Sequence, residues 1–206
     1  MVGKFQQSDV EILSSSTAYD GFFKLRNLCI RHRLFEGGWS EVFERELCVR
    51  GDAVGVLLYD PKLERFALVE QLRVGVLQRQ QSPWLLELVA GMLDKNGEDC
   101  EALARREVRE ESGLEVTALE PVCRYFCSPG GSTEFFTLFC GRVDLTNING
   151  GIFGVDDEHE DICLHVLPVD DVITMLEQGD INNAMTIIAL QWFLLHRRRL
   201  DALWDD

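Results

Sequence analysis

The sequence is short of positive charge. It holds 20 lysines and arginines against 35 aspartates and glutamates, which gives a formal net charge of −15. A general nucleic-acid binder gains its affinity by neutralising phosphates with lysine and arginine, so this balance argues against that class of protein. An anionic small molecule would need a local solution, either a divalent metal or a few well-placed arginines.

The sequence also lacks a long apolar run. The longest run, Ile187 to Leu195, is interrupted by Gln191 and is far shorter than a membrane-spanning helix. The first residues, MVGKFQQSDVEILSSS, lack the apolar core of a secretory signal. We therefore expect no membrane partner and a cytoplasmic location.

Paired cysteines are absent as well. The seven cysteines are odd in number and none belongs to a C-x-x-C pair. Cys123 and Cys127 are four residues apart but have no histidine or third cysteine beside them, so a zinc site is not expected. Reduced thiols that behave as small hydrophobes agree with a reducing compartment.

The 206 residues suit one domain with a modest appendage. Residues 24–49 read as two extended segments around the turn EGGWS, and residues 1–50 are expected to be a strand-rich section before a main domain at 51–206. Strands of the main domain are indicated at DAVGVLLYD, RFALVEQLRV, WLLELVAG, PVCRYFC, FFTLFCGRVDL and ICLHVLP.

Helices are indicated at about Cys100–Ser112, near Val169–Glu177 and from Asn182 onward. The last helix is apolar almost all round, so we expect it to be buried against a sheet. The Gly- and acid-rich stretch NINGGIFGVDDEHED has no period and is expected to be a mobile loop. Together these patterns predict a mixed α/β fold.

Three glutamates, Glu107, Glu110 and Glu111, lie within five positions of the first predicted helix, although like charges three and four residues apart repel one another. On a helical wheel the face of Glu107 and Glu111 also holds Cys100, Leu103, Ala104 and Leu114. The opposite face holds Ala102, Arg105, Arg109 and Ser112. The carboxylates are therefore expected to point inward and the arginines outward.

Carboxylates on a partly buried stripe repel one another and lose hydration unless a positive charge lies among them. Mg²⁺ prefers carboxylate and carbonyl oxygens, and Glu107 and Glu111 can reach one ion from successive turns. Arg106 lies four residues before Glu110 and eight after Glu98, so it can pair with either carboxylate. The stripe predicts a metal site, and an acidic helix stabilised by arginine pairs is the alternative.

The segment from Gly91 through Glu98 to REVREESGL resembles the Nudix box, G-x5-E-x7-R-E-U-x-E-E-x-G-U, in which U is an aliphatic residue. Every fixed position from Glu98 onward matches, but the six residues MLDKNG stand between Gly91 and Glu98 where the pattern has five. The extra residue falls in a turn, where insertions are tolerated. Further segments resemble the ADP-ribose pyrophosphatase branch of the Nudix hydrolases: WLLELVAGM, SPGGSTE, DEHEDICLHV and DINNAMTIIALQWFLLH.

This resemblance implies an α/β/α sandwich around a mixed sheet. It also implies a homodimer in which the N-terminal strands of one subunit help to build the partner's site. The implied cofactor is Mg²⁺, for which Mn²⁺ could substitute. Its implied ligands are Glu107, Glu111 and the carbonyl of Ala90. Glu110 is implied to be either a further ligand or a residue that contacts the ligands without binding the metal.

The resemblance places the catalytic base in DDEHED, with Glu158 as the first candidate and Glu160 as the second, and it places Glu110 and Arg106 in the same catalytic centre. A solvated acidic loop is the alternative for DDEHED. The expected substrate contacts are Arg73, Arg45, Phe22, Met92, Ser128, Pro129 and Gly130, with Phe23 as the alternative to Phe22 for stacking on the adenine. Taken alone, the two arginines would be ordinary strand-edge residues, Phe22 a core residue, and SPGGS a plain hairpin turn.

The activity expected from the resemblance is Mg²⁺-dependent hydrolysis of ADP-ribose to AMP and ribose 5-phosphate. A Nudix hydrolase for another nucleoside diphosphate sugar, such as GDP-mannose, shares the same box. A Nudix-fold sensing module without catalysis is a further alternative, although this chain keeps every box carboxylate. An ATP-consuming phosphotransferase is not supported, because the sequence has no G-x-x-x-x-G-K-[ST] loop.

Overall fold

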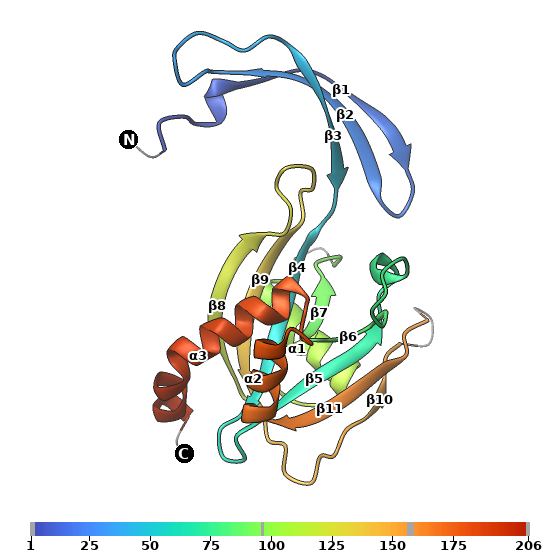
Figure 1. Ribbon diagram of the computed structural model, residues 1–206, viewed down its shortest axis with the longest axis vertical. Coiled ribbons are helices and arrows are strands. Elements are labelled where there is room, and N and C mark those ends of the chain that lie inside the picture. The colour runs from blue at the N-terminus through green and yellow to red at the C-terminus, as the bar shows by residue number, and fades with distance from the viewer. Residues whose placement is uncertain (1–2, 96, 156–158, 205–206) are drawn as a thin grey trace. The chain divides into compact units, whose positions relative to one another are not determined.

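A computed structural model describes residues 3–95, 97–155 and 159–204 (Figure 1). The predicted base Glu158 lies outside these residues. The chain forms two compact units, Met1–Gly51 with Phe126–Phe135, and Asp52–Tyr125 with Phe136–Asp206. Within the described residues, no helix combines the length and the apolar character needed to cross a membrane.

The first unit is a three-stranded antiparallel sheet in the order β1-β2-β3, preceded by a short 3-10 helix, η1 (Gln7–Asp9). Strands β2 (Lys24–His32) and β3 (Phe43–Val49) are the two predicted extended segments. Strand β1 (Val10–Asp20) was not predicted, because its serine run, SSS, shows no apolar alternation. It forms by pairing its backbone along β2 from Val10↔His32 to Asp20↔Lys24.

The described part of the first unit has no buried core. None of its described residues is buried, and large apolar side chains such as Ile12 (64% exposed), Phe35 (83%) and Phe22 (84%) face outward. Its third strand is tied to the loop between β8 and β9, where Cys48 N–H donates to the Gly131 carbonyl at 2.8 Å. A small sheet of this kind is marginal by itself, so it needs a further surface to pack against.

The second unit is built on a mixed sheet in the order β10-β11-β5-β4-β9-β8, with β6 pairing β5 and β7 pairing β4. The strands are β4 (Asp52–Asp60), β5 (Arg65–Leu72), β6 (Trp84–Glu87), β7 (Val89–Met92), β8 (Ala118–Phe126), β9 (Phe135–Arg142), β10 (Gly151–Phe153) and β11 (Ile162–Pro168). A short 3-10 helix, η2 (Val74–Val76), lies in the connection between β5 and β6. The short strand β10 pairs with β11 inside the stretch that was predicted to be a loop, so that prediction was wrong at 151–153.

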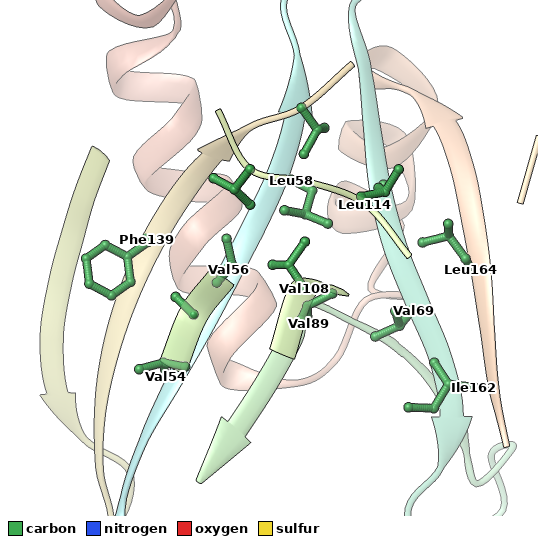
Figure 2. Packing of buried hydrophobic residues seen from close by; sticks show 14 of the residues in the cluster. Val54, Val56, Leu58, Val69, Val89, Val108, Leu114, Phe139, Ile162 and Leu164 are labelled. Atoms are coloured by element: carbon green, nitrogen blue, oxygen red, sulfur yellow. The ribbon is translucent and has the colours of Figure 1, made fainter. Parts of the chain in front are cut away.

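Helices cover both faces of this sheet. Helix α1 (Cys100–Ser112) lies on one face, and α2 (Val169–Gln178) and α3 (Ala184–Trp204) lie on the other (Figure 1). Alternation along β4 divides the core. Val56 packs in the cluster of α1, shown in Figure 2, whereas Leu57 packs in the cluster of α3. The expected α/β/α sandwich is confirmed. The last helix packs one face against the sheet, but the prediction that it is buried rather than on the surface was wrong for its other face, where Leu194 and Leu195 are 48% and 82% exposed.

Helix α1 begins and ends where its sequence predicts. The Asp99 side chain accepts a hydrogen bond from Ala102 N–H at 2.8 Å, and Gly113 adopts a left-handed φ of 66° after the last turn. The prediction that Ser112 faces outward was wrong, because its side chain is buried. Its hydroxyl donates to the Val108 carbonyl one turn back, which satisfies it without water.

The single strand predicted for WLLELVAG is two strands separated by Leu88. Strand β6 pairs with β5, and β7 pairs with β4, so the chain changes partners at this residue. Two hydrogen bonds to the start of α3 fix this change of partner. Leu88 N–H donates to the hydroxyl of Thr186 in the first turn at 3.2 Å, and Asn183 Nδ2, just before the helix, donates to the Leu86 carbonyl at 2.9 Å. The apolar sequence WLLELVAG does not indicate this break, because the break depends on a helix almost a hundred residues away.

Replacing Thr186 with valine should test this anchor. The change keeps the shape of the buried side chain but leaves Leu88 N–H without its acceptor, so we expect the free energy of unfolding to fall by about 1–3 kcal/mol. Urea unfolding measures this fall. Thr174→Val is the control, because Thr174 is exposed and bonds only its own helix. Equal effects of the two changes would show that the hydroxyl of Thr186 does not support the break.

Candidate active site

The centre of the site is the contact between α1 and β7. Glu107 and Glu111 lie one helical turn apart on the buried side of α1, and Glu111 is only 3% exposed. Glu111 Oε2 accepts a hydrogen bond from Ala90 N–H at 3.1 Å. A Cβ atom at position 91 would overlap the Glu107 carboxylate, so only glycine lets the strand come this close to the helix.

Arg106 connects the turn before α1 to the helix itself. Its guanidinium donates to both carboxylate oxygens of Glu98, at 3.0 and 3.1 Å, and to Glu110 at 2.9 Å. It also forms ion pairs with Glu107 at 2.7 Å and with Asp94 at 3.4 Å. The pairing lowers the pKa of Glu98 below its usual range. The inserted residue in this turn therefore does not stop Glu98 from reaching Arg106.

Burial changes the acidity of the two inward glutamates. Loss of hydration raises the pKa of Glu111 to about 8, although the bond from Ala90 N–H acts in the opposite direction. Loss of hydration likewise raises the pKa of Glu107 to about 7, opposed by the charge of Arg106. The charge of Glu160 adds to the rise at both residues. The pair is therefore short of positive charge, which a cation would supply.

The donor chemistry of this cluster fits a hard divalent cation. Carboxylate oxygens from Glu107, Glu110 and Glu111 come from one helix, and the Gly91 backbone leaves room for them beside the Ala90 peptide. Among the described residues, no three acidic, histidine or cysteine side chains are already arranged around one point.

The two candidates for the base differ in what the structure describes. Glu158 lies outside the described residues. Glu160 comes just before β11, and its Oε2 accepts a hydrogen bond from Val155 N–H at 3.1 Å. Because its charge raises the pKa of both Glu107 and Glu111, Glu160 lies within electrostatic reach of the metal-site candidates.

Two more predicted residues belong to the same unit. Met92 ends β7, one residue beyond Gly91, and is 38% exposed. Arg73 follows the end of β5, and its Nε donates to Glu87 Oε2 at 2.5 Å. The charge of Arg73 lowers the pKa of Glu111, so the guanidinium is within electrostatic reach of that carboxylate.

Two polar residues near Arg73 were missed by the sequence analysis. Glu87 is 6% exposed at the end of β6, and burial raises its pKa. Gln71 on β5 is also buried, and its Nε2 has no hydrogen-bond partner in the described part of the chain. The available signal was Glu87 inside the otherwise apolar WLLELV, and Gln71 next to Glu70 in ALVEQL.

The remaining predicted residues belong to the first unit. Phe22 is 84% exposed, with its ring centroid 5.0 Å from that of Phe23, so the alternative of a core role for Phe22 was wrong. Arg45 on β3 stacks over Phe43 at 4.5 Å and donates to its neighbour's carbonyl. Ser128, Pro129 and Gly130 form the β8–β9 turn, which the Ser128 carbonyl closes by accepting Gly131 N–H at 3.1 Å.

The raised pKa values of Glu107 and Glu111 predict how the metal-free protein responds to pH. The folded protein holds protons on Glu107 and Glu111 that the unfolded chain releases at the ordinary glutamate pKa. Their stabilising contribution is therefore complete below about pH 4.5 and is lost as the pH rises through about 7 and 8. In EDTA, the melting temperature of Glu111→Gln should fall less than that of the wild type as the pH is raised from about 5 to about 9.

Glu115→Gln is the matched control for this experiment, because Glu115 is exposed and pairs with Arg109 just beyond α1. It should follow the wild-type curve through the same pH range. Parallel curves for Glu111→Gln and the wild type would show that Glu111 keeps an ordinary pKa.

Comparison with known proteins agrees with this geometry. The model of the NUDIX domain matches residues 49–189. The chain is 43% identical over 200 residues to an ADP-ribose pyrophosphatase of Escherichia coli (strain K12), covering 97% of this chain and 95% of that protein. It is 32% identical over 189 residues to a GDP-mannose pyrophosphatase of Cronobacter sakazakii, covering 89% of this chain and 94% of that protein.

Among solved structures, a protein described as an ADP compounds hydrolase is similar with a TM-score of 0.69. The alignment covers 95% of this chain and 96% of that one at 20% identity, so it supports the fold alone. The family model spans the sheet, α1 and the first part of α3, including every residue of the carboxylate cluster. With its box residues gathered between α1 and β7, the chain belongs to the Nudix hydrolase family.

Proposed function

We propose that this protein hydrolyses the pyrophosphate bond of ADP-ribose and releases AMP and ribose 5-phosphate. The observation that carries the proposal is the 43% identity to an ADP-ribose pyrophosphatase, because it extends over 97% of the chain. It therefore includes the strands of the first unit as well as the box. The relative that acts on GDP-mannose has a lower identity, 32%.

The proposed cofactor is Mg²⁺, in keeping with a family that typically depends on divalent metals. Glu107, Glu111 and the Ala90 carbonyl would hold the ion, and Glu110 lies beside them in contact with Arg106. A bound Mg²⁺ neutralises charge on the pyrophosphate and lowers the pKa of a bound water. Mn²⁺ has similar ligand preferences and could substitute.

The other candidate residues of the second unit would have separate roles in catalysis and substrate binding. Glu160 or Glu158 would accept the proton from the attacking water, since a carboxylate near the metal can act as general base. Arg106 holds the turn at Glu98 against the helix and so keeps the metal-binding face in place. Arg73 would bind a phosphate oxygen through its guanidinium, for which arginine geometry is well suited. Met92 would contact the substrate beside the Gly91 backbone.

We further propose that residues 1–50 are a dimerisation section. The support is the lack of any buried residue among those that the structure describes in the first unit, which leaves its apolar side chains for a second copy to cover. In the dimer, Arg45 and Phe22 of one subunit would contact the substrate in the partner's site. Ser128, Pro129 and Gly130 would contribute the turn that approaches the substrate.

The alternatives differ in their support. A preference for GDP-mannose has the C. sakazakii relative in its favour, and the two substrates share the bond to be cleaved. A sensing module without catalysis has no comparable support, because Glu107, Glu110 and Glu111 are all present at the box positions. Product analysis separates these possibilities.

Incubation with Mg²⁺ and, in separate tubes, ADP-ribose, GDP-mannose and a nucleoside triphosphate should give AMP and ribose 5-phosphate fastest from ADP-ribose. Chromatography identifies the products. Glu111→Gln should lower kcat by at least about 100-fold, because it removes a proposed metal ligand, whereas Glu115→Gln should not. Faster cleavage of GDP-mannose would show that GDP-mannose, and not ADP-ribose, is the preferred substrate. Binding without cleavage would favour the sensing module.

Sedimentation should show a dimer at the concentrations used for activity assays. The reason is the exposed apolar surface of the first unit, which a second copy would bury. Replacing the exposed Ile12 on β1 with lysine tests the same surface and should shift the equilibrium toward monomer. A wild-type monomer that is fully active at nanomolar protein would rule out a shared site.

A further inference from the structure

The ion pair between Arg73 and Glu87 occupies a defined place in the sheet. Glu87 is the last residue of β6 and lies opposite Val69 of β5. Val69 packs in the core cluster on the α1 side, and side chains directly opposite each other share a face of the sheet. Glu87 therefore points toward the face that carries Glu107 and Glu111, and it meets Arg73 there at 2.5 Å.

The two partners differ in exposure. The Glu87 side chain is 8% exposed, whereas the Arg73 side chain is 42% exposed. A buried carboxylate loses hydration and requires a partner, and that loss raises the pKa of Glu87 despite the nearby arginine. A pair of this kind is weak evidence for a role in stability, because desolvation can offset the attraction. The buried Glu87 carboxylate therefore binds the guanidinium from the protein interior, and the rest of the Arg73 side chain is open to solvent.

The main chain on both sides of the pair is also fixed. Arg73 N–H donates to the Pro83 carbonyl at 2.8 Å, which closes the loop between β5 and β6. Glu87 lies between Leu86 and Leu88, and both of these are bonded to the first turn of α3. The carboxylate therefore has a rigid base from which to orient the guanidinium.

The bond to Glu87 uses one particular donor of Arg73. A guanidinium has five N–H donors, and the structure pairs the one on Nε with Glu87. The terminal nitrogens Nη1 and Nη2 make no hydrogen bond to a described residue. Two parallel N–H groups on these nitrogens match two oxygens of one phosphate. The charge of Arg73 also lowers the pKa of Glu111, so the guanidinium is within electrostatic reach of this proposed metal ligand.

We propose that Glu87 is a positioning residue that holds Arg73 by its Nε, so that the terminal nitrogens are presented to the diphosphate of the substrate. This inference rests on the proposed function and adds a residue to it. A free arginine loses side-chain freedom when it binds an anion, and a partner that has already ordered the side chain reduces that loss. Glu87 therefore acts on substrate affinity through Arg73 and not by touching the substrate.

The test is a double-mutant cycle of Glu87→Gln and Arg73→Gln in the full-length protein with Mg²⁺. The first readout is the split between kcat and KM for ADP-ribose. The second is the Kd, from calorimetry, of an ADP-ribose analogue in which a methylene replaces the bridging oxygen. Melting temperatures show that each variant is folded. Glu70→Gln is the matched control, because Glu70 lies on the same strand as Val69, points to the opposite face and pairs with His165 at 2.7 Å.

Glu87→Gln should raise the Kd and the KM by about tenfold, the loss expected when a charged hydrogen bond no longer orders the arginine, with kcat changed by less than about twofold. The double variant should bind no more weakly than Arg73→Gln alone, because Glu87 has no further effect once its arginine is gone. Glu70→Gln should match the wild type. The inference is overturned if Glu87→Gln leaves the Kd unchanged, or if it weakens binding equally when Arg73 is absent.

Arg73→Lys provides a second test in which Glu87 is intact. Lysine keeps the positive charge but lacks the pair of terminal nitrogens, so it should bind the analogue about as weakly as Arg73→Gln. Wild-type affinity of Arg73→Lys would show that a point charge is enough and that its orientation has no role.

Inorganic pyrophosphate separates this inference from the choice of substrate. If the wild type does not cleave ADP-ribose, the proposed function fails, but the same variants can still be titrated with pyrophosphate and Mg²⁺. Weaker pyrophosphate binding by Glu87→Gln, absent from the Arg73→Gln background, would then support the positioning role alone. Unchanged pyrophosphate binding by both single variants would overturn it.

Discussion

The close contact between α1 and β7 is the constraint on which the site depends. Two carboxylates of like charge are buried there against a strand backbone, and neither burial nor charge favours that arrangement by itself. Gly91 makes it sterically possible, since any Cβ would occupy the place of the Glu107 carboxylate. Ala90 N–H and Arg106 each satisfy one of the two acids. A cation would offset the repulsion and lost hydration in this contact, in keeping with the proposed metal site.

The rest of the second unit holds that contact in place from both sides. On one side, Leu103, Ala104 and Val108 anchor α1 in the core, which keeps the face that carries Glu107 and Glu111 toward the sheet. On the other side, Thr186 and Asn183 hold the chain where it leaves β6 and enters β7. The change of strand partner at Leu88 directs Glu87 toward Arg73 and the Ala90–Gly91 backbone toward α1. One break in a strand thus serves both the metal-site and the phosphate-site candidates.

The parts that could be predicted from sequence are those with local causes. The bounds of α1 follow from Asp99 and Gly113, which act within one turn of the helix ends, and the inward face follows from the spacing of Glu107 and Glu111. The parts that could not be predicted depend on distant partners. Nothing in WLLELVAG marks the break that α3 imposes. Likewise, the serine run of β1 becomes a strand only because β2 supplies its hydrogen bonds. Glu87 appears as one acid in an apolar run until the fold brings Arg73 to it.

The anchoring of Leu88 by Thr186 also has a consequence for the order in which the protein is made. Strands β6 and β7 and helix α1 leave the ribosome well before α3, which is the last helix of the described chain. Until that helix emerges, the backbone between the two strands lacks the hydroxyl and the amide that hold its change of direction. The box glutamates on α1 are therefore made before the hydrogen bonds that fix the backbone between β6 and β7 can form. Assembly of the site therefore waits until α3 has been made.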